Sequence, residues 1–519
     1  MRTVLLAGCL TLLSCAAGSE RTSLHVAHAA PAHAPGDSSP VRQLAEPQQV
    51  PGLDLLALAI AQNAEPELWV DAGESADEAR EAMAAARTDG SSPELDAALA
   101  TTDALLSWRA WRVYAGNWPE ELPGDPVWDP MVSSWHESRG AWRTAIETLL
   151  TVSQGHHPQT DEVLLDVLFR SGQTPRAAQE LGVSLRRWPA HAPLHELARA
   201  WRDVIPDPSA LATQLRAQLG SRQGEIPGFT EQALGTIGVL HLSWAMRVQE
   251  AGDPAEAARL YEAGADALAR ADGPGQTMDA WELASRRADC LVNAGWLRFA
   301  EAKAAIESEG LDAALPALQL AEQNFIGALK EVPDDPDASQ GIGLTGDLYY
   351  QAGSLEGIRD FFGRVAPQFE NPEWWNNHAF FCRETGEYET SYASYQACIA
   401  LSPDNPRWVN DTGLILLYHL DRDLDLAEEY FRRAWALGVE VCENPFVSDD
   451  KYEDAFLGYT DAMHNLSLLL ARQGDFQQAV EVNAELLEIA PGRPDATQLK
   501  FELERALAES AGSDDADMK

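Results

Sequence analysis

The sequence predicts an all-α protein in which antiparallel helix pairs stack into a solenoid. Three observations lead to this fold class. From about residue 52 onward, apolar residues recur with the period of a helix, and alternating β-branched runs are scarce. Gly and Pro interrupt the pattern at regular intervals, and one segment of the chain repeats the pattern of another. A chain of 519 residues is long enough for several domains or for one long array.

The internal repeat is clearest between residues 375–403 and 463–491. The first segment has Trp375, Ala379, Gly386, Tyr388, Ser391, Tyr395, Cys398 and Pro403 at the positions where the second has Met463, Ser467, Gly474, Phe476, Ala479, Asn483, Leu486 and Pro491. This spacing predicts two helices in each segment. A small residue of one helix meets a small residue of the other, so the two backbones approach closely. The glycines end the first helix, and the prolines stop the second.

The spacing resembles the tetratricopeptide repeat, a helix–turn–helix unit of about 34 residues. Further partial matches give eight candidate units between residues 126 and 493. The resemblance implies a tetratricopeptide-like α-solenoid, a right-handed superhelix of antiparallel helix pairs. The first helices of successive units would then line a concave groove that a segment of a partner protein can enter.

The predicted array is not uniform. Within it, we expect a degenerate helix pair at 192–237, one long helix at 279–309, and a turn with two extra residues at Asp421–Asp425. The expected divisions of the chain are an N-terminal helical region at 51–125, partly degenerate repeats at 126–237, repeats at 238–493, a C-terminal capping helix at 494–510 and an acidic tail at 511–519. The role of residues 51–125 stays open.

The N-terminus predicts export. Arg2 precedes an apolar stretch of about twelve residues, which suits a signal peptide and is too short to span a bilayer. Residues 1–18 are therefore expected to be a signal peptide. Residues 12–15 (LLSC) resemble the lipobox of bacterial lipoproteins, which implies lipidation of Cys15. Cys9 also fits a lipobox, but only after a shorter apolar stretch, and an ordinary secretory peptide remains the alternative; which signal peptidase cleaves stays open.

Residues 19–50 are rich in Ala, Pro, Ser and His and have no apolar period, as is typical of a disordered tether. Together with the lipobox, this segment predicts a protein of the bacterial cell envelope that is lipid-anchored at the outer membrane or the periplasmic face. The membrane would be contacted only through the N-terminal lipid. The alternative location is secreted.

The charge of the chain limits its partners. Lys and Arg number 38 against 81 Asp and Glu, which gives a formal net charge of −43 at pH 7. Such a surface repels nucleic-acid phosphates and anionic lipid headgroups, so no nucleic-acid partner is expected. A protein or peptide partner of basic or neutral character is favoured.

Motifs for catalysis or metal binding are not supported by their context. His195-Glu196 begins like a zincin motif, but Arg199 stands where the second histidine must be. Residues 341–346 spell G-x-G-x-x-G without a preceding strand, so a dinucleotide site is not expected. The protein is therefore predicted to be no enzyme and to use no metal and no cofactor.

The cysteines beyond Cys15 form no C-x-x-C pair and are expected to act as small buried hydrophobic residues. They are Cys290, Cys382, Cys398 and Cys442. Their disulfide status stays open, although Cys382 and Cys398 are expected to lie near opposite ends of one helical hairpin, too far apart to bridge.

The expected function is that of a non-enzymatic protein–protein interaction scaffold. Carrying the groove-facing positions of the tetratricopeptide repeat onto the clearest units gives a candidate partner-binding set. It comprises Asn376, Phe380, Arg383, Asn410, Leu414, Tyr418, His464 and Arg472. The alternative is a structural subunit of an outer-membrane assembly, export or pilus machine, in which the contact is permanent and large. The identity of the partner and the oligomeric state stay open.

Overall fold

The computed structural model describes residues 69–88, 158–170, 173–222 and 226–517, together with single positions between 52 and 106. Residues 50–519 form one compact unit, and the description concerns that unit. The predicted signal peptide, Cys15 and the tether lie outside the described residues, as do residues 107–157. No described helix has both the length and the apolar character needed to cross a membrane.

The described elements are helices that alternate between the first and second helix of successive pairs, as the sequence predicts. Before the pairs lies α2 (Trp69–Arg87). The first helices are α5 (Pro158–Arg170), α7 (Ala192–Ala200), α9 (Phe229–Glu250), α11 (Ala280–Glu309), α13 (Pro336–Gln351), α15 (Pro372–Glu384), α17 (Pro406–Leu414) with the π-helical turn η4 (Ile415–Leu420), and α19 (Asp449–Gln473). The second helices are α6 (Thr174–Arg187), α8 (Pro208–Arg222), α10 (Pro254–Ala269), α12 (Leu311–Glu331), α14 (Leu355–Val365) with the 3-10 turn η3 (Ala366–Gln368), α16 (Tyr388–Leu401), α18 (Leu424–Glu443) and α20 (Phe476–Ile489), and α21 (Pro494–Asp517) closes the array.

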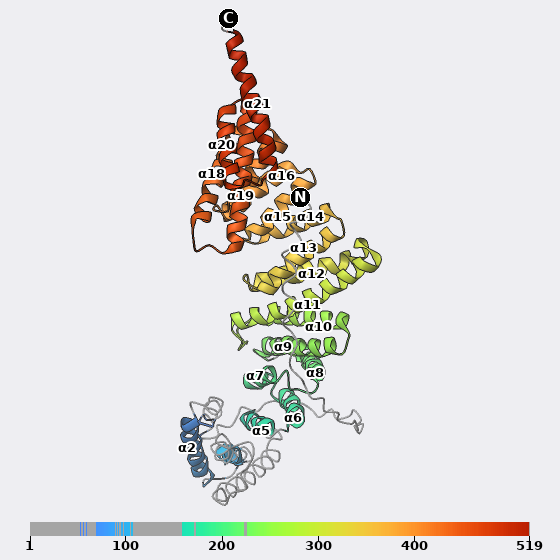
Figure 1. Ribbon diagram of the computed structural model, residues 1–519. Helices are drawn as coiled ribbons and strands as arrows, with labels where there is room; N and C mark the ends of the chain where they lie inside the picture. Colours follow the sequence, from blue (N-terminus) through green and yellow to red (C-terminus); the bar gives the residue numbers. More distant parts are fainter. Residues whose placement is uncertain are drawn as a thin grey trace, which may run out of the picture. The chain divides into compact units, whose positions relative to one another are not determined.

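Neighbouring helices pack against each other along the chain (Figure 1). The degenerate pair α7 and α8 differs, because its two helices pack mainly on α9 and hardly contact each other. The turns between pairs explain where the helices begin. Asp335 and Asn405 each accept a hydrogen bond from a backbone N–H in the first turn of the helix that follows, and a proline occupies its first position. Gly386 and Gly474 have φ angles of 84° and 86° where first helices end, as predicted.

Two features of the helix lengths were expected and one was not. The long helix expected at 279–309 is α11, which begins after an Asp279 cap that accepts from the N–H of Glu282. The extra residues near Asp421–Asp425 are taken up by η4 and by left-handed Asp421 and Asp423. In contrast, α21 continues to Asp517, past the end at residue 510 that the sequence predicts for the capping helix.

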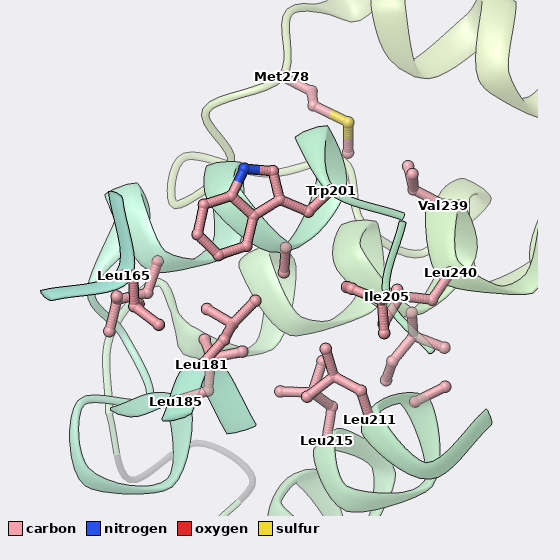
Figure 2. Close-up of a cluster of buried hydrophobic side chains, with 14 of the residues drawn as sticks. Leu165, Leu181, Leu185, Trp201, Ile205, Leu211, Leu215, Val239, Leu240 and Met278 are labelled. Atoms are coloured by element: carbon pink, nitrogen blue, oxygen red, sulfur yellow. The ribbon is translucent and has the colours of Figure 1, made fainter. Parts of the chain in front are cut away.

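A continuous core connects the degenerate pair to its neighbours. Figure 2 shows Leu165 of α5, Leu181 of α6, Trp201 after α7, Leu211 of α8 and Leu240 of α9 drawn together in one cluster. Their side chains are at most 7% exposed. Since no pair of helices can bury its apolar face alone, this shared cluster is what holds the irregular segment in the array.

The glycine motif at 341–346 has a packing role. The Phe325 ring of α12 is fully buried between Gly295 of α11 and Gly341 of α13. A Cβ at Gly341 would lie 2.5 Å from Cζ of Phe325, and one at Gly295 would lie 2.6 Å from Cε1 of the same ring. Gly346 meets Phe362 of α14 in a similar way. Gly341 and Gly346 therefore provide room for aromatic rings.

The four cysteines in the described part of the chain are free thiols. Cys290, Cys382 and Cys398 are buried, as expected, whereas Cys442 is partly exposed. Burial raises the pKa of the Cys382 thiol to about 11, and the thiol contacts Nε2 of His378 at 3.4 Å. A thiol with this pKa is protonated at neutral pH and is a poor nucleophile.

Candidate functional site

The candidate site is the face formed by the first helices α15, α17 and α19 and by the closing helix α21. We call it the first-helix face. Each of these helices except α19 begins at a proline preceded by a turn, and the repeat spacing places equivalent residues at the same height in successive helices. Polar side chains at these heights connect one helix to the next. The predicted partner-binding residues all lie on these helices or in the turn η4.

Asn410, Asn465 and Tyr418 form a hydrogen-bonded group between α17 and α19. Asn465 Nδ2 donates to Oδ1 of Asn410 at 2.9 Å, and the hydroxyl of Tyr418 donates to Oδ1 of Asn465 at 3.0 Å. Asn410 is only 2% exposed, while Tyr418 is 48% exposed. Asn410 therefore joins two helices, and Tyr418 is the member of the group that faces solvent.

Asn465 was not among the predicted residues. It directly follows His464, as Asp411 follows Asn410 and Asn377 follows Asn376. Its position in the repeat could have pointed to it, because it lies one residue after a groove-facing position of the tetratricopeptide repeat. In α19 the side chain at this position contacts the preceding first helix, α17.

Asp411 is the second site residue that sequence reasoning missed. Its carboxylate accepts a hydrogen bond from Nδ2 of Asn410 at 3.2 Å. Burial raises the pKa of Asp411 to about 6, although the positive charges of Arg383 and Arg407 act to lower it. A carboxyl group with this pKa changes its charge just below neutral pH.

Phe380 and Arg383, both predicted, lie together on α15. The Arg383 guanidinium carbon is 4.7 Å from the centroid of the Phe380 ring, which is a cation–π geometry. Arg383 also pairs with Glu384. Asn376, one turn earlier on the same helix, is partly exposed. These three residues extend the first-helix face from α17 onto α15.

The contact between α19 and α21 is also polar. Nε2 of His464 lies 3.8 Å from a carboxylate oxygen of Asp495, and Arg493 donates to Asp461 at 2.6 Å. Burial lowers the pKa of His464, outweighing the raising effect of Asp495. Nδ1 of His464 is buried without a hydrogen-bond partner. Asp461 and Arg493 were not predicted, and His464 was.

The remaining predicted residues lie apart from this polar row. Arg472 donates to the backbone carbonyl of Leu417 at 3.3 Å and pairs with Asp421, so it holds the end of the η4 turn. Leu414 is partly buried in a small apolar cluster around Tyr395 and Ile415. The face thus combines buried polar contacts between helices with a few partly exposed side chains. Within the described residues, no group of three His, Cys, Asp or Glu side chains could hold a metal ion.

Comparison with known proteins identifies one repeat of the array. The profile of the family described as "Tetratricopeptide repeat" matches residues 373–405, which cover α15 and α16. The chain therefore contains a tetratricopeptide repeat where the sequence analysis found the clearest unit, and the family supports a protein–protein interaction scaffold. None of the curated proteins matches this chain significantly.

Solved structures with similarity to this chain include two that are described as TPR proteins. YrrB, whose structure is described as that of a TPR protein with an unusual peptide-binding site, is 17% identical, with 41% of this chain and 92% of that chain covered and a TM-score of 0.28. The C-terminal part of a TPR repeat-containing protein from Cytophaga hutchinsonii is 12% identical, with coverages of 59% and 98% and a TM-score of 0.28. BtubC from P. vanneervenii is 17% identical, with coverages of 57% and 91% and a TM-score of 0.22. Scores this low say nothing about ligands or partners.

Proposed function

We propose that this protein is a non-enzymatic scaffold that binds an extended segment of a partner protein on the first-helix face. The observation that carries the proposal is the chain of hydrogen bonds through Asn410, Asn465 and Tyr418. It fixes α17 against α19 and leaves the Tyr418 ring half exposed. A fixed row of polar and aromatic side chains binds a flexible segment at a lower entropic cost than a mobile surface does.

The partner segment is proposed to be neutral or basic, because the chain has a net charge of −43. The protein is further proposed to act in the bacterial cell envelope, held by a lipid on Cys15 and standing off the membrane on residues 19–50. Support for the location comes from the sequence of residues 1–50. Secretion without an anchor is the alternative location.

A second candidate function is that of a structural subunit in an outer-membrane assembly, export or pilus machine. The burial of Asn410 and Asn465 between α17 and α19 favours it, because much of the hydrogen-bonding capacity of the face is used inside the array. In that case other surfaces, such as the ends of the array, would carry permanent contacts.

The test is affinity capture from a detergent-solubilised envelope extract with the full chain as bait. The variant N376A/Y418A/H464A removes three partly exposed or exposed side chains of the first-helix face and leaves the formal net charge unchanged. The matched control T390A/Q396A/Q477A removes three exposed polar side chains from the second helices α16 and α20. Asn410 is left intact, because its burial makes it a structural residue.

A partner retained by the wild type and the control but lost by N376A/Y418A/H464A supports the scaffold proposal and identifies the segment. Equal capture by all three proteins contradicts it. If capture is instead lost when α21 is deleted from a chain that remains helical, the structural-subunit function is favoured.

A further inference from the structure

The pair α18 and α19 is longer than the repeat requires. In the unit at 375–403 the second helix stops at Pro403, and the next first helix begins at Pro406. The equivalent positions one unit later are Val439 and Thr460. Yet α18 continues to Glu443, and α19 already begins at Asp449. Residues 439–459 therefore stand where the unit at 375–403 has only residues 403–405 before the next helix, and we call them the α18–α19 arm (Figure 1). Insertions into repeat arrays are often binding elements.

A series of aromatic rings leads from the core to the tip of this arm. Tyr459 is 5% exposed and packs against Gly438, where a Cβ would lie 2.7 Å from Cγ of the tyrosine. The rings of Phe456 and Tyr459 have centroids 5.5 Å apart, and those of Tyr452 and Phe456 are stacked at 6.0 Å. Tyr452 is 41% exposed, and Phe446 in the connecting loop is 93% exposed. Apolar surface thus increases toward solvent along the arm.

The loop that carries Phe446 is held in place by hydrogen bonds. Oδ1 of Asn444 accepts from the backbone N–H of Phe446 at 3.0 Å, and the N–H of Val447 donates to the carbonyl of Asn444 at 3.3 Å. At the start of α19, the N–H of Tyr452 donates to the carbonyl of Ser448 at 2.9 Å. The loop is a defined turn, and it presents the Phe446 ring to solvent although burial of that ring would be favourable.

The exposed rings are surrounded by carboxylates. Between residues 440 and 454 the chain has six Asp or Glu residues and a single lysine, Lys451. Five of these acidic residues are exposed, namely Glu440, Glu443, Asp449, Asp450 and Glu453. An aromatic ring beside carboxylates attracts arginine and lysine for three reasons. The cation binds over the face of the ring, and the carboxylates balance its charge. The aliphatic part of the arginine or lysine side chain covers the apolar surface.

The other long helix pair shows that acidity and length alone do not produce this surface. The tip between α11 and α12 carries exposed Glu307, Glu309 and Asp312 around Gly310. Yet none of the large apolar side chains exposed in the described part of the chain lies at that tip. Both arms extend an acidic tip into solvent, and the aromatic display is specific to the α18–α19 arm.

We propose that the tip of the α18–α19 arm is a second docking site, which binds an amphipathic segment of a partner protein rich in arginine or lysine. Phe446 and Tyr452 provide the apolar anchors, and the surrounding carboxylates select a basic segment. A second copy of this chain would bring the same acidic surface against itself, and an anionic membrane would be repelled by the same groups. The site is separate from the first-helix face and does not depend on it.

The test measures binding of a fluorescein-labelled amphipathic peptide to the full chain by fluorescence anisotropy at physiological ionic strength. The peptide is a designed helix with arginine on one face and leucine on the other, and a second peptide has glutamate in place of every arginine. The variants are F446S/Y452S, which removes the anchors, and E443Q/D449N/D450N, which removes three carboxylates. The matched control E307Q/E309Q/D312N removes three carboxylates from the α11–α12 tip. All substituted residues are exposed, and unchanged helical circular dichroism checks folding.

We expect the arginine peptide to bind the wild type, the control and N376A/Y418A/H464A with affinities within about twofold of one another. Binding should weaken about tenfold or more in F446S/Y452S and in E443Q/D449N/D450N, as is typical of aromatic and charged hot spots. The glutamate peptide should not bind. Retained binding by N376A/Y418A/H464A separates this site from the proposed function of the first-helix face.

Several outcomes would overturn the proposal. No binding to the wild type, equal binding to F446S/Y452S, or an equal loss in the α11–α12 control would show that the tip is not a specific basic-peptide site. The same holds if wild type, but not F446S/Y452S, binds vesicles containing phosphatidylglycerol, because the occupant would then be a membrane. Self-association in sedimentation velocity that F446S/Y452S abolishes would instead make the occupant a second copy.

Discussion

Replacing Gly341 by alanine should force a methyl group against the Phe325 ring. The new Cβ would lie 2.5 Å from Cζ of that ring, well inside the usual carbon–carbon contact of about 3.5–4.0 Å. The ring has little room to move, because it is fully buried and Gly295 packs against the same ring atoms, where a Cβ would itself lie 2.6 Å from Cε1. Overpacking of this kind costs about 1–3 kcal/mol. The gain in helix propensity from Gly to Ala, about 1 kcal/mol, acts in the opposite direction.

Gly343 offers a matched control in the same helix. A Cβ at this position has no heavy atom within 4 Å, so Gly343→Ala should change stability only through helix propensity. The propensity gain is common to both variants, and the difference between their free energies of unfolding should therefore be about 1–3 kcal/mol, with G341A the less stable. A smaller side chain at position 325 should relieve the clash with the new methyl group. Phe325→Leu should therefore destabilise G341A less than it destabilises the wild type.

The assay is urea unfolding of the full chain followed by helical circular dichroism, with hydrogen exchange of peptides from α12 and α13. Exchange is needed because repeat arrays can unfold in parts. Protection should fall in α12 and α13 of G341A and not in α20. Equal stability of G341A and G343A, or independent effects of G341A and F325L, would refute the idea that the ring fills the space left by Gly341.

Two further predictions concern charge and targeting. Burial raises the pKa of Asp411 from an unfolded value near 3.8 to about 6 in the folded state. Between these pH values the native state binds more protons than the unfolded state, so its stability falls as the pH rises from 3.8 to 6. Asp411→Asn should therefore be more stable than wild type by up to about 3 kcal/mol at pH 8 and by about half as much at pH 5; an advantage that does not change with pH in urea unfolding would contradict this. For Cys15, labelling with radioactive palmitate in a bacterial host should be lost in Cys15→Ser and kept in Cys9→Ser, and the reverse pattern would assign the anchor to Cys9.

The helical array follows from local features that a single chain reveals. Prolines at first positions and capping residues such as Asp279, Asp335 and Asn405 mark where helices begin. The 30-residue helix α11 was predictable in a similar way, because Asp279 caps its start and no proline interrupts it. The additional length of α18 and α19 was missed, since the repeat pattern describes the positions it contains and gives no account of an insertion between them.

The first-helix face was only partly predictable. Repeat spacing placed Asn410 and Tyr418 on it, but the spacing carries no information on which of them contacts the neighbouring helix. That depends on Asn465, 55 residues further along the chain, whose side-chain amide donates a hydrogen bond to Oδ1 of Asn410. Tyr418 stays half exposed. Asp411 was missed for a related reason, because a carboxylate in the sequence shows neither its burial nor the arginines around it.

By itself, the sequence determined the helix pairs and their order, because periodicity, caps and turns act over a few residues. It also determined the strong negative charge, which limits the chemistry of any partner. Only the tertiary structure decided that Gly341 makes room for Phe325, that Asn410 is buried, and that Phe446 is exposed at the tip of an arm. These properties depend on which side chains meet across helices far apart in the chain, and close packing there is set by the facing surface and not by the local pattern.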